Sequence, residues 1–223
     1  QINHSMMSVP LSSGPHRSML LRSSLAAGVA VLLAACEPAA GPVVLGVAGP
    51  FTTAYGASMR QGVELAVREV NDAGGVRGRT LQLRFADDEA NPDAALRVAE
   101  SLYEDPEVVA VVGHVNSGAM LHAASVYEQG LPAVATSATS AEISRAGDFV
   151  FRVAPSDASN AAELARFAAA GDQPTAILYE NEDYGRGLAD AFHSALAAAG
   201  GRVVSVDPYL PRTRDFRPFL ERM

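Results

Sequence analysis

Hydroxyl-bearing residues gather at two points where an apolar run gives way to a helical pattern. The run 108–112 leads through a short loop to Ser117, and the run 131–135 leads to Ser137, Thr139 and Ser140. A helix N-terminus has free N–H groups and a positive dipole end, which suits a carboxylate. Serine and threonine hydroxyls add neutral donors there. Each residue alone also fits an ordinary helix cap, but two such sites on neighbouring strand ends favour a shared small ligand.

Two tyrosines strengthen that interpretation, because each stands beside a glycine in a polar loop: Tyr55 before Gly56 and Tyr184 before Gly185.

Apolar runs predict strands separated by helical patterns. Strands are expected at 43–49, 81–87, 108–113, 131–137, 149–155, 175–181 and 201–207. Helices are expected at 55–72, 91–104, 117–129, from about 140, at 160–170, 184–199 and 215–223. The first helix places Met59, Val63, Ala66 and Val70 on one apolar face.

This alternation predicts an α/β fold of parallel strands. In such sheets ligands bind beyond the carboxyl ends of the strands. The polar loops at those ends are 48–56, 87–93, 113–118, 136–142 and 179–185. They contain the hydroxyls and both tyrosines, so the ligand site is expected there.

Enzyme chemistry has little support in this pattern. His114 is the single histidine in a site loop, and no loop cysteine or GxSxG motif accompanies it, so a supporting or solvated role is expected. Neither a Walker A nor a GxGxxG motif is present. The acids Asp87, Asp88, Glu89 and Asp93 lack the glycine and final glutamate of an EF-hand loop, and a solvated loop with helix-start acids is expected. No cofactor or metal is expected.

Composition limits partners and compartment. The 223 residues allow one large or two small domains, and a net charge of −8 disfavours binding to nucleic acid.

The N-terminal residues are typical of a secretory signal. Arg17 and Arg22 precede the apolar run SSLAAGVAVLLAA, which is too short to span a bilayer. Leu33-Ala34-Ala35-Cys36 resembles the lipobox of bacterial lipoproteins, in which the cysteine is lipidated; a general signal with an incidental cysteine is the alternative. Residues 1–35 are then leader and signal, and 36–42 a tether.

Five blocks in order carry a family resemblance: GVAGPFTTAYG, ADDEANPD, GHVNSG, TSATSAE and YENEDYG. They resemble the bacterial Leu/Ile/Val-binding proteins, which are type I periplasmic solute-binding proteins of ABC importers. The resemblance extends from Val43 to about Arg222. It implies two doubly wound parallel-sheet lobes, with an amino acid bound in the cleft between them and delivered to a membrane permease. Lobe one is expected at 43–155 and the start of the second at 156–223.

The resemblance also implies roles for individual residues. It places Ser117 and Thr139 on the α-carboxylate of the ligand, and Ser137, the Ala138 backbone and Thr139 near the α-ammonium. Tyr55 and Tyr184 would flank the ligand from the two lobes. The loop 136–142 is one residue shorter than in some relatives, so the roles of Ser137, Ala138 and Thr139 can shift by one position.

The family continues well past the end of this chain, so the resemblance implies an N-terminal fragment with an incomplete second lobe. The acid that pairs with the ammonium would then lie beyond Met223. The expected partners are an amino acid and a permease, with membrane attachment through the lipid on Cys36 in a periplasmic or cell-surface location. A ligand-sensing regulatory protein on the same fold, for an amino acid or amide, is the alternative.

Overall fold

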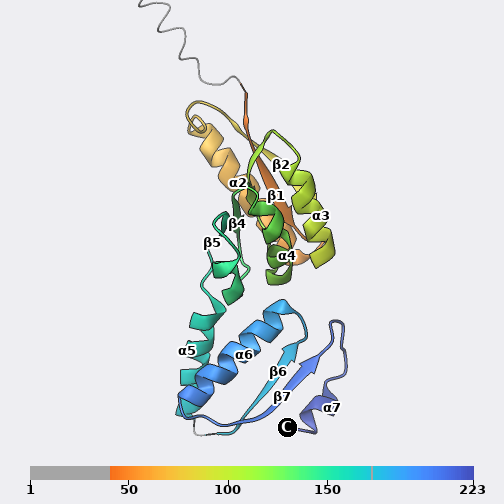
Figure 1. Ribbon diagram of the computed structural model, residues 1–223, viewed down its shortest axis with the longest axis vertical. Coiled ribbons are helices and arrows are strands. Elements are labelled where there is room, and N and C mark those ends of the chain that lie inside the picture. The colour runs from red at the N-terminus through yellow and green to blue at the C-terminus, as the bar shows by residue number, and fades with distance from the viewer. Residues whose placement is uncertain (1–40, 172) are drawn as a thin grey trace, which may run out of the picture. The chain divides into compact units, whose positions relative to one another are not determined.

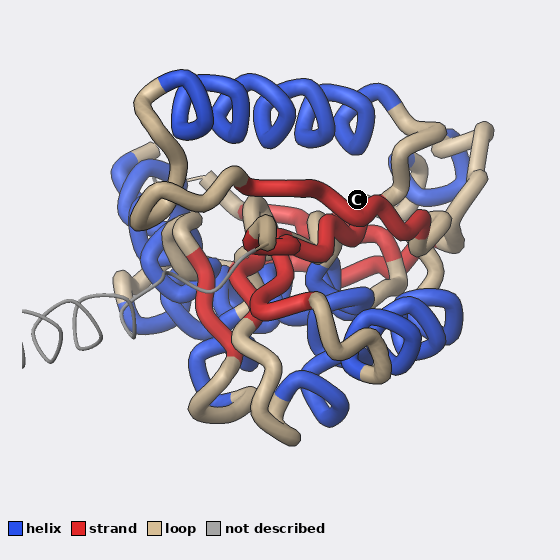
Figure 2. The backbone as a smooth tube through the Cα atoms, turned by 90° about the horizontal axis from the view of Figure 1, so that it is seen from above, coloured by secondary structure: helices blue, strands red, loops and turns tan. Residues whose placement is uncertain are grey.

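The structure is a computed structural model that describes residues 41–171 and 173–223. Cys36 and the expected signal and tether therefore lie outside the described residues. Figure 1 shows the elements in chain order, and Figure 2 shows helices flanking the strands. Within the described part of the chain, every helix is too short or too polar to cross a membrane.

Five parallel strands form the first sheet, in the order β2-β1-β3-β4-β5. The strands and helices of this part are β1 (Val43–Gly49), α2 (Ala54–Asp72), β2 (Leu81–Asp87), α3 (Pro92–Tyr103), β3 (Val108–Val112), α4 (Ser117–Tyr127), β4 (Ala133–Ala135), the 3₁₀ helix η1 (Ala141–Arg145) and β5 (Val150–Arg152). The prediction of parallel α/β structure is confirmed. Because the strand order reverses between β1 and β3, the carboxyl ends of these two strands flank a crevice suited to a ligand.

A second sheet contains two parallel strands, β6 and β7. Its elements are α5 (Asp157–Ala170), β6 (Thr175–Glu180), α6 (Asp183–Ala198), β7 (Val203–Tyr209) and α7 (Arg217–Leu220). Helices α5 and α6 pack side by side. The expected lobe boundary between 155 and 156 falls between β5 and α5, and it stays a prediction.

Side-chain caps fix where several helices begin. Thr53 Oγ1 accepts from the Gly56 N–H, 3.1 Å away, and Asn91 Oδ1 accepts from the Ala94 N–H at 3.0 Å. Each bond satisfies an N–H that the helix itself leaves unpaired. Helix α5 starts at Asp157 rather than at the expected residue 160, because Ser156 caps it.

The core of the first sheet lies under α3 and α4. Its largest fully buried apolar side chains include Met120, Tyr127, Val111 and Ile143. Helix α2 differs from the prediction, since Gly56 is its one buried residue and its apolar face is incompletely covered, with Val70 37% exposed. Amphipathic spacing therefore identified the helix correctly but not the extent of its burial.

Candidate functional site

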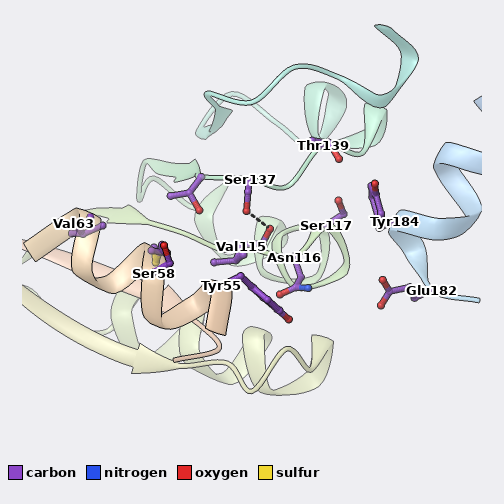
Figure 3. A pocket seen from close by; sticks show the side chains of 13 residues that line it. Tyr55, Ser58, Val63, Val115, Asn116, Ser117, Ser137, Thr139, Glu182 and Tyr184 are labelled. Atoms are coloured by element: carbon purple, nitrogen blue, oxygen red, sulfur yellow. Dashed lines mark hydrogen bonds between the residues drawn. The ribbon is translucent and has the colours of Figure 1, made fainter. Parts of the chain in front are cut away.

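A pocket of about 690 Å³ opens at the carboxyl ends of the strands. Figure 3 shows lining side chains projecting from α2, from the loops and from other helix starts. They come from α2 (Tyr55, Ser58, Met59, Gly62, Val63), the β3–α4 loop and the start of α4 (Val115, Asn116, Ser117), the β4–η1 loop (Thr136, Ser137, Thr139) and the start of α6 (Glu182, Tyr184). The pocket thus combines an apolar wall on α2 with hydroxyls from two neighbouring strand ends.

Five of the six ligand-binding residues expected from the sequence line this pocket: Tyr55, Ser117, Ser137, Thr139 and Tyr184. The sixth, Ala138, is 2% exposed and its side chain packs into the core. The expected contact was between the Ala138 backbone and the ligand ammonium, and burial of the side chain is compatible with such a contact. Which atoms of a ligand these residues contact stays a prediction.

Gly113 ends the strand because the backbones of β1 and the β3–α4 loop approach closely there. Its φ is +132°, and a Cβ at this position would lie 2.1 Å from the carbonyl oxygen of Ala48. Both the left-handed conformation and the lack of space exclude a side chain. The chain can therefore turn tightly from the sheet toward the pocket.

Ser117 does not cap α4, so the helix-cap interpretation of this residue is wrong. Asn116 occupies the cap position without a side-chain cap bond, and Ser117 is the first helical residue. The Ser117 side chain is 3% exposed, and its Oγ accepts from the Ser140 N–H at 3.2 Å. Since a hydroxyl can accept and donate at once, the Ser117 proton remains available to an acceptor in the pocket.

Further bonds hold the two hydroxyl-bearing loops together. Ser137 Oγ donates to the Val115 carbonyl at 3.2 Å. Ser140 caps η1, accepting from the Glu142 N–H at 3.3 Å. The cap interpretation therefore fits Ser140, while Ser117 and Ser137 cross-link the loops.

Arg152 is a supporting residue that the sequence did not indicate. Its Nη1 donates to the carbonyls of Thr139 at 3.1 Å and Ser140 at 2.7 Å, and its Nη2 donates to Ser144 Oγ at 2.7 Å. One guanidinium from the end of β5 thereby fixes the backbone that follows the Thr139 side chain. The sequence did not indicate this role, because the partners of Arg152 come close to it only in the folded structure.

Asp157 is a second residue that the sequence did not single out. It is 2% exposed, and its Oδ2 is buried without a hydrogen-bond partner among the described residues. Its N–H donates to the Thr139 carbonyl at 2.9 Å. Burial raises the pKa of Tyr184, and the negative charges of Asp157 and Glu182 raise it further. A negative charge therefore lies close to two pocket residues, although in sequence Asp157 resembles any helix-start acid.

Glu182 adds a second carboxylate, at the pocket surface. Partial burial raises the pKa of Glu182, the charges of Glu180 and Asp183 raise it further, and Arg186 acts in the opposite direction. The start of α6 is therefore electrostatically negative, whereas the start of α4 presents N–H groups. These two helix starts are neighbours, since a Cβ on Gly118 of α4 would lie 2.9 Å from Asp183 Oδ2 of α6. Groups suited to an anion and groups suited to a cation therefore lie side by side, as the carboxylate and ammonium of an α-amino acid require.

His114 lies outside the pocket, in the core behind the β3–α4 loop. Its Nδ1 is 2.6 Å from Asp88 Oδ2 and its Nε2 is 2.8 Å from the Tyr127 hydroxyl. Asp88 and His114 are both fully buried. The expectation that Asp88 belongs to a solvated acidic loop is wrong, because this carboxylate is paired inside the protein.

Comparison with known proteins assigns the chain to a family. Residues 42–223 match the family described as periplasmic binding protein. The chain belongs to this family. Its α/β architecture is the type I periplasmic-binding-protein fold, which confirms the predicted resemblance and fold class.

Three relatives illustrate the membership. The chain is 31% identical to the Leu/Ile/Val-binding protein homolog 3 of Brucella melitensis, over 81% of this chain and 51% of the relative. It is 31% identical to the leucine-, isoleucine-, valine-, threonine- and alanine-binding protein of Pseudomonas aeruginosa, over 90% of this chain and 56% of the relative. An ABC transporter substrate-binding protein from Desulfitobacterium hafniense, solved in complex with Leu, is 35% identical with a TM-score of 0.67, over 81% of this chain and 53% of that one. The chain thus spans about half the length of the relatives it matches.

Proposed function

We propose that this chain belongs to an extracytoplasmic solute-binding protein that captures an amino acid, with leucine, isoleucine or valine as the preferred class, for delivery to an ABC importer. The observation that carries the proposal is the Ser117 hydroxyl, whose proton is free, at the start of α4 and on the wall of the pocket. Helix α4 has 11 residues and no side-chain cap, so first-turn N–H groups remain for a carboxylate. Thr139 adds a hydroxyl from the neighbouring loop.

The negative end of the pocket supports recognition of an α-ammonium. Among the described residues Asp157 Oδ2 has no hydrogen-bond partner, and its charge is close enough to Tyr184 to raise the pKa of that tyrosine. Glu182 lines the pocket directly. An ammonium near Thr139 and Tyr184 would be attracted by both carboxylates, while the ligand carboxylate is held at the adjoining start of α4.

The side-chain class follows from the α2 wall. Apolar surface beside Tyr55 comes from Met59 and Val63 on α2, and the neighbouring β3–α4 loop adds Val115. Burial of aliphatic groups against such surface is favourable by about 0.8 kcal/mol per CH₂. The relatives described above, which are named as binding leucine, isoleucine and valine or were solved with leucine, favour the same class of ligand.

Ligand analogues test the proposal by removing one charged group at a time. In the full-length protein, calorimetry should show leucine binding at least about tenfold more tightly than leucinamide, which lacks the carboxylate, and than 4-methylpentanoate, which lacks the ammonium. A panel of the standard amino acids should rank the aliphatic ones first. Equal affinity for leucine and both analogues would contradict the proposed function.

Delivery to an importer requires a location outside the cytoplasm, and the lipobox-like Leu33-Ala34-Ala35-Cys36 supports the further proposal of a lipid anchor on Cys36. The anchor is tested by expressing Cys36→Ser with labelled fatty acid. We expect unprocessed precursor and no label, and normal processing of the variant would indicate an ordinary signal peptide instead. Transport itself would proceed by closure of two lobes on the ligand, with no bond made or broken.

A further inference from the structure

Three buried polar side chains form a continuous hydrogen-bonded chain behind the pocket. His114 bridges Asp88, at 2.6 Å from its Nδ1, and Tyr127, at 2.8 Å from its Nε2. All three are fully buried, and none lines the pocket. Direct contact with a ligand therefore does not explain their presence.

The direction of each hydrogen bond follows from the chemistry of the groups. An ionised carboxylate can only accept, so the Nδ1–H of His114 donates to Asp88. In the neutral imidazole with its proton on Nδ1, Nε2 accepts from the hydroxyl of Tyr127. Burial raises the pKa of Tyr127, and the charge of Asp88 raises it further, which keeps that hydroxyl protonated as a donor. Both ring nitrogens of His114 are thus hydrogen-bonded to protein groups. Such a satisfied buried network is rigid, and breaking one of its bonds is energetically costly.

The partners of His114 come from the loop after β2 and from the last residue of α4. His114 itself lies in the loop that leads from Gly113 to Ser117. Gly113 is in turn packed against the Ala48 carbonyl. The loop is thus attached on one side to the β2–α3 connection and on the other to the far end of the helix that it begins.

We propose that Asp88, His114 and Tyr127 act as a positioning unit that holds residues 113–117 and the start of α4 in the orientation needed to receive the ligand carboxylate. The inference rests on the proposed function, because it concerns how that carboxylate is recognised. Loss of the unit should weaken carboxylate recognition selectively, since none of its three residues lies on α2, which carries most of the apolar wall.

The test compares leucine with leucinamide in the full-length protein. The ratio of the two dissociation constants reports carboxylate recognition, and thermal unfolding reports stability. His114→Asn keeps a donor for Asp88 but does not reach Tyr127. Tyr127→Phe removes the same link while leaving the His114–Asp88 bond intact. We expect the selectivity ratio to fall about tenfold in His114→Asn and by a smaller factor in Tyr127→Phe.

Leu102→Ala is the matched control, because Leu102 is buried in the same core but packs against Gly46 rather than the pocket loop. It should lose stability and keep the wild-type ratio. If both substitutions in the unit lower stability yet leave the ratio unchanged, the unit is merely structural and the inference is wrong. If His114→Asn does not fold, Tyr127→Phe decides the matter alone. Failure of the wild-type protein to bind either compound is a separate result, which overturns the proposed function and this inference with it.

Discussion

Ser117 and Ser140 are joined across two strand ends by a hydrogen bond, in which the Ser140 N–H donates to Ser117 Oγ at 3.2 Å. The Ser117 hydroxyl therefore has a structural partner as well as a free proton. Substitutions at Ser117 should affect stability and binding together, and the two effects have to be measured separately.

Ser117→Ala should weaken leucine binding about 10- to 150-fold, since a hydrogen bond to a charged group contributes about 1.5–3 kcal/mol. It should also lower stability by about 1–3 kcal/mol, because the buried Ser140 N–H loses its acceptor. Calorimetry and thermal unfolding measure the two effects. Ser125→Ala, at an exposed position of α4, is the control and should change neither. Wild-type affinity in Ser117→Ala would place the carboxylate elsewhere.

Asp157→Asn removes a charge without changing shape. Affinity for leucine should fall about tenfold if the carboxylate attracts the ammonium, whereas binding of 4-methylpentanoate, which has no ammonium, should not weaken. The pKa of Tyr184 should fall toward its ordinary value, since the Asp157 charge helps to raise it. Ultraviolet titration measures this pKa when the curve of a Tyr184→Phe variant is subtracted, because the sequence contains six tyrosines. Parallel losses for both ligands would exclude the electrostatic explanation.

Tyr55→Ala should alter the preference among ligand side chains. Tyr55 is 49% exposed in the first turn of α2 and lines the pocket. Affinity for leucine should fall by about 1–3 kcal/mol more than affinity for alanine, with the leucine-to-leucinamide ratio preserved. Tyr103→Ala removes another exposed tyrosine outside the pocket and should have no effect on binding. A changed leucine-to-leucinamide ratio in Tyr55→Ala would mean that Tyr55 acts on the carboxylate.

Glu182→Gln should remove part of the pH dependence of stability. The folded state raises the pKa of Glu182 above its ordinary value, mainly through burial. Between those two values the folded state binds more protons than the unfolded state, so the wild-type protein loses stability as pH rises through that range. The variant should therefore be more stable than wild type at neutral pH, by a small amount because the side chain is largely solvated. Urea unfolding at a series of acid pH values should show that the stability difference between the variant and wild type vanishes below the pKa of Glu182 in the unfolded state. A difference that stays constant with pH would contradict this explanation.

Gly113→Ala should cost about 2–5 kcal/mol, combining left-handed strain with overlap against the Ala48 carbonyl. Gly130→Ala is the matched control. Gly130 also has a positive φ, +121°, but a Cβ there meets nothing within 4 Å. The difference between the two variants in urea unfolding isolates the close contact. Equal losses would show that strain alone explains the requirement for glycine.

The sequence predicted most elements because helix and strand periodicities depend on local side-chain order. The strands expected at 131–137 and 149–155 were too long, however, since β4 and β5 contain three residues each. Apolar character reports burial, and residues beside a short strand can be buried without joining its hydrogen-bond ladder.

The pocket was also largely predictable, because parallel topology brings the strand-end loops together whatever their separation in sequence. Its supporting contacts were not. His114 and Asp88 are separated by 26 positions, and His114 and Tyr127 by 13. Neither spacing follows a helix or strand period. Such pairings become visible once the loops are placed in three dimensions.

Arg152 has a thermodynamic consequence for ligand capture. Its guanidinium satisfies two carbonyls and a hydroxyl of the loop around Thr139. Loops left free in the unbound protein lose conformational entropy when a ligand orders them, and that loss reduces affinity. Here the backbone around Thr139 is fixed before any ligand arrives, so more of the interaction energy at this loop is retained as affinity. A lysine could not replace this arginine, because its single ammonium lacks the planar, two-sided array of donors that reaches all three oxygens.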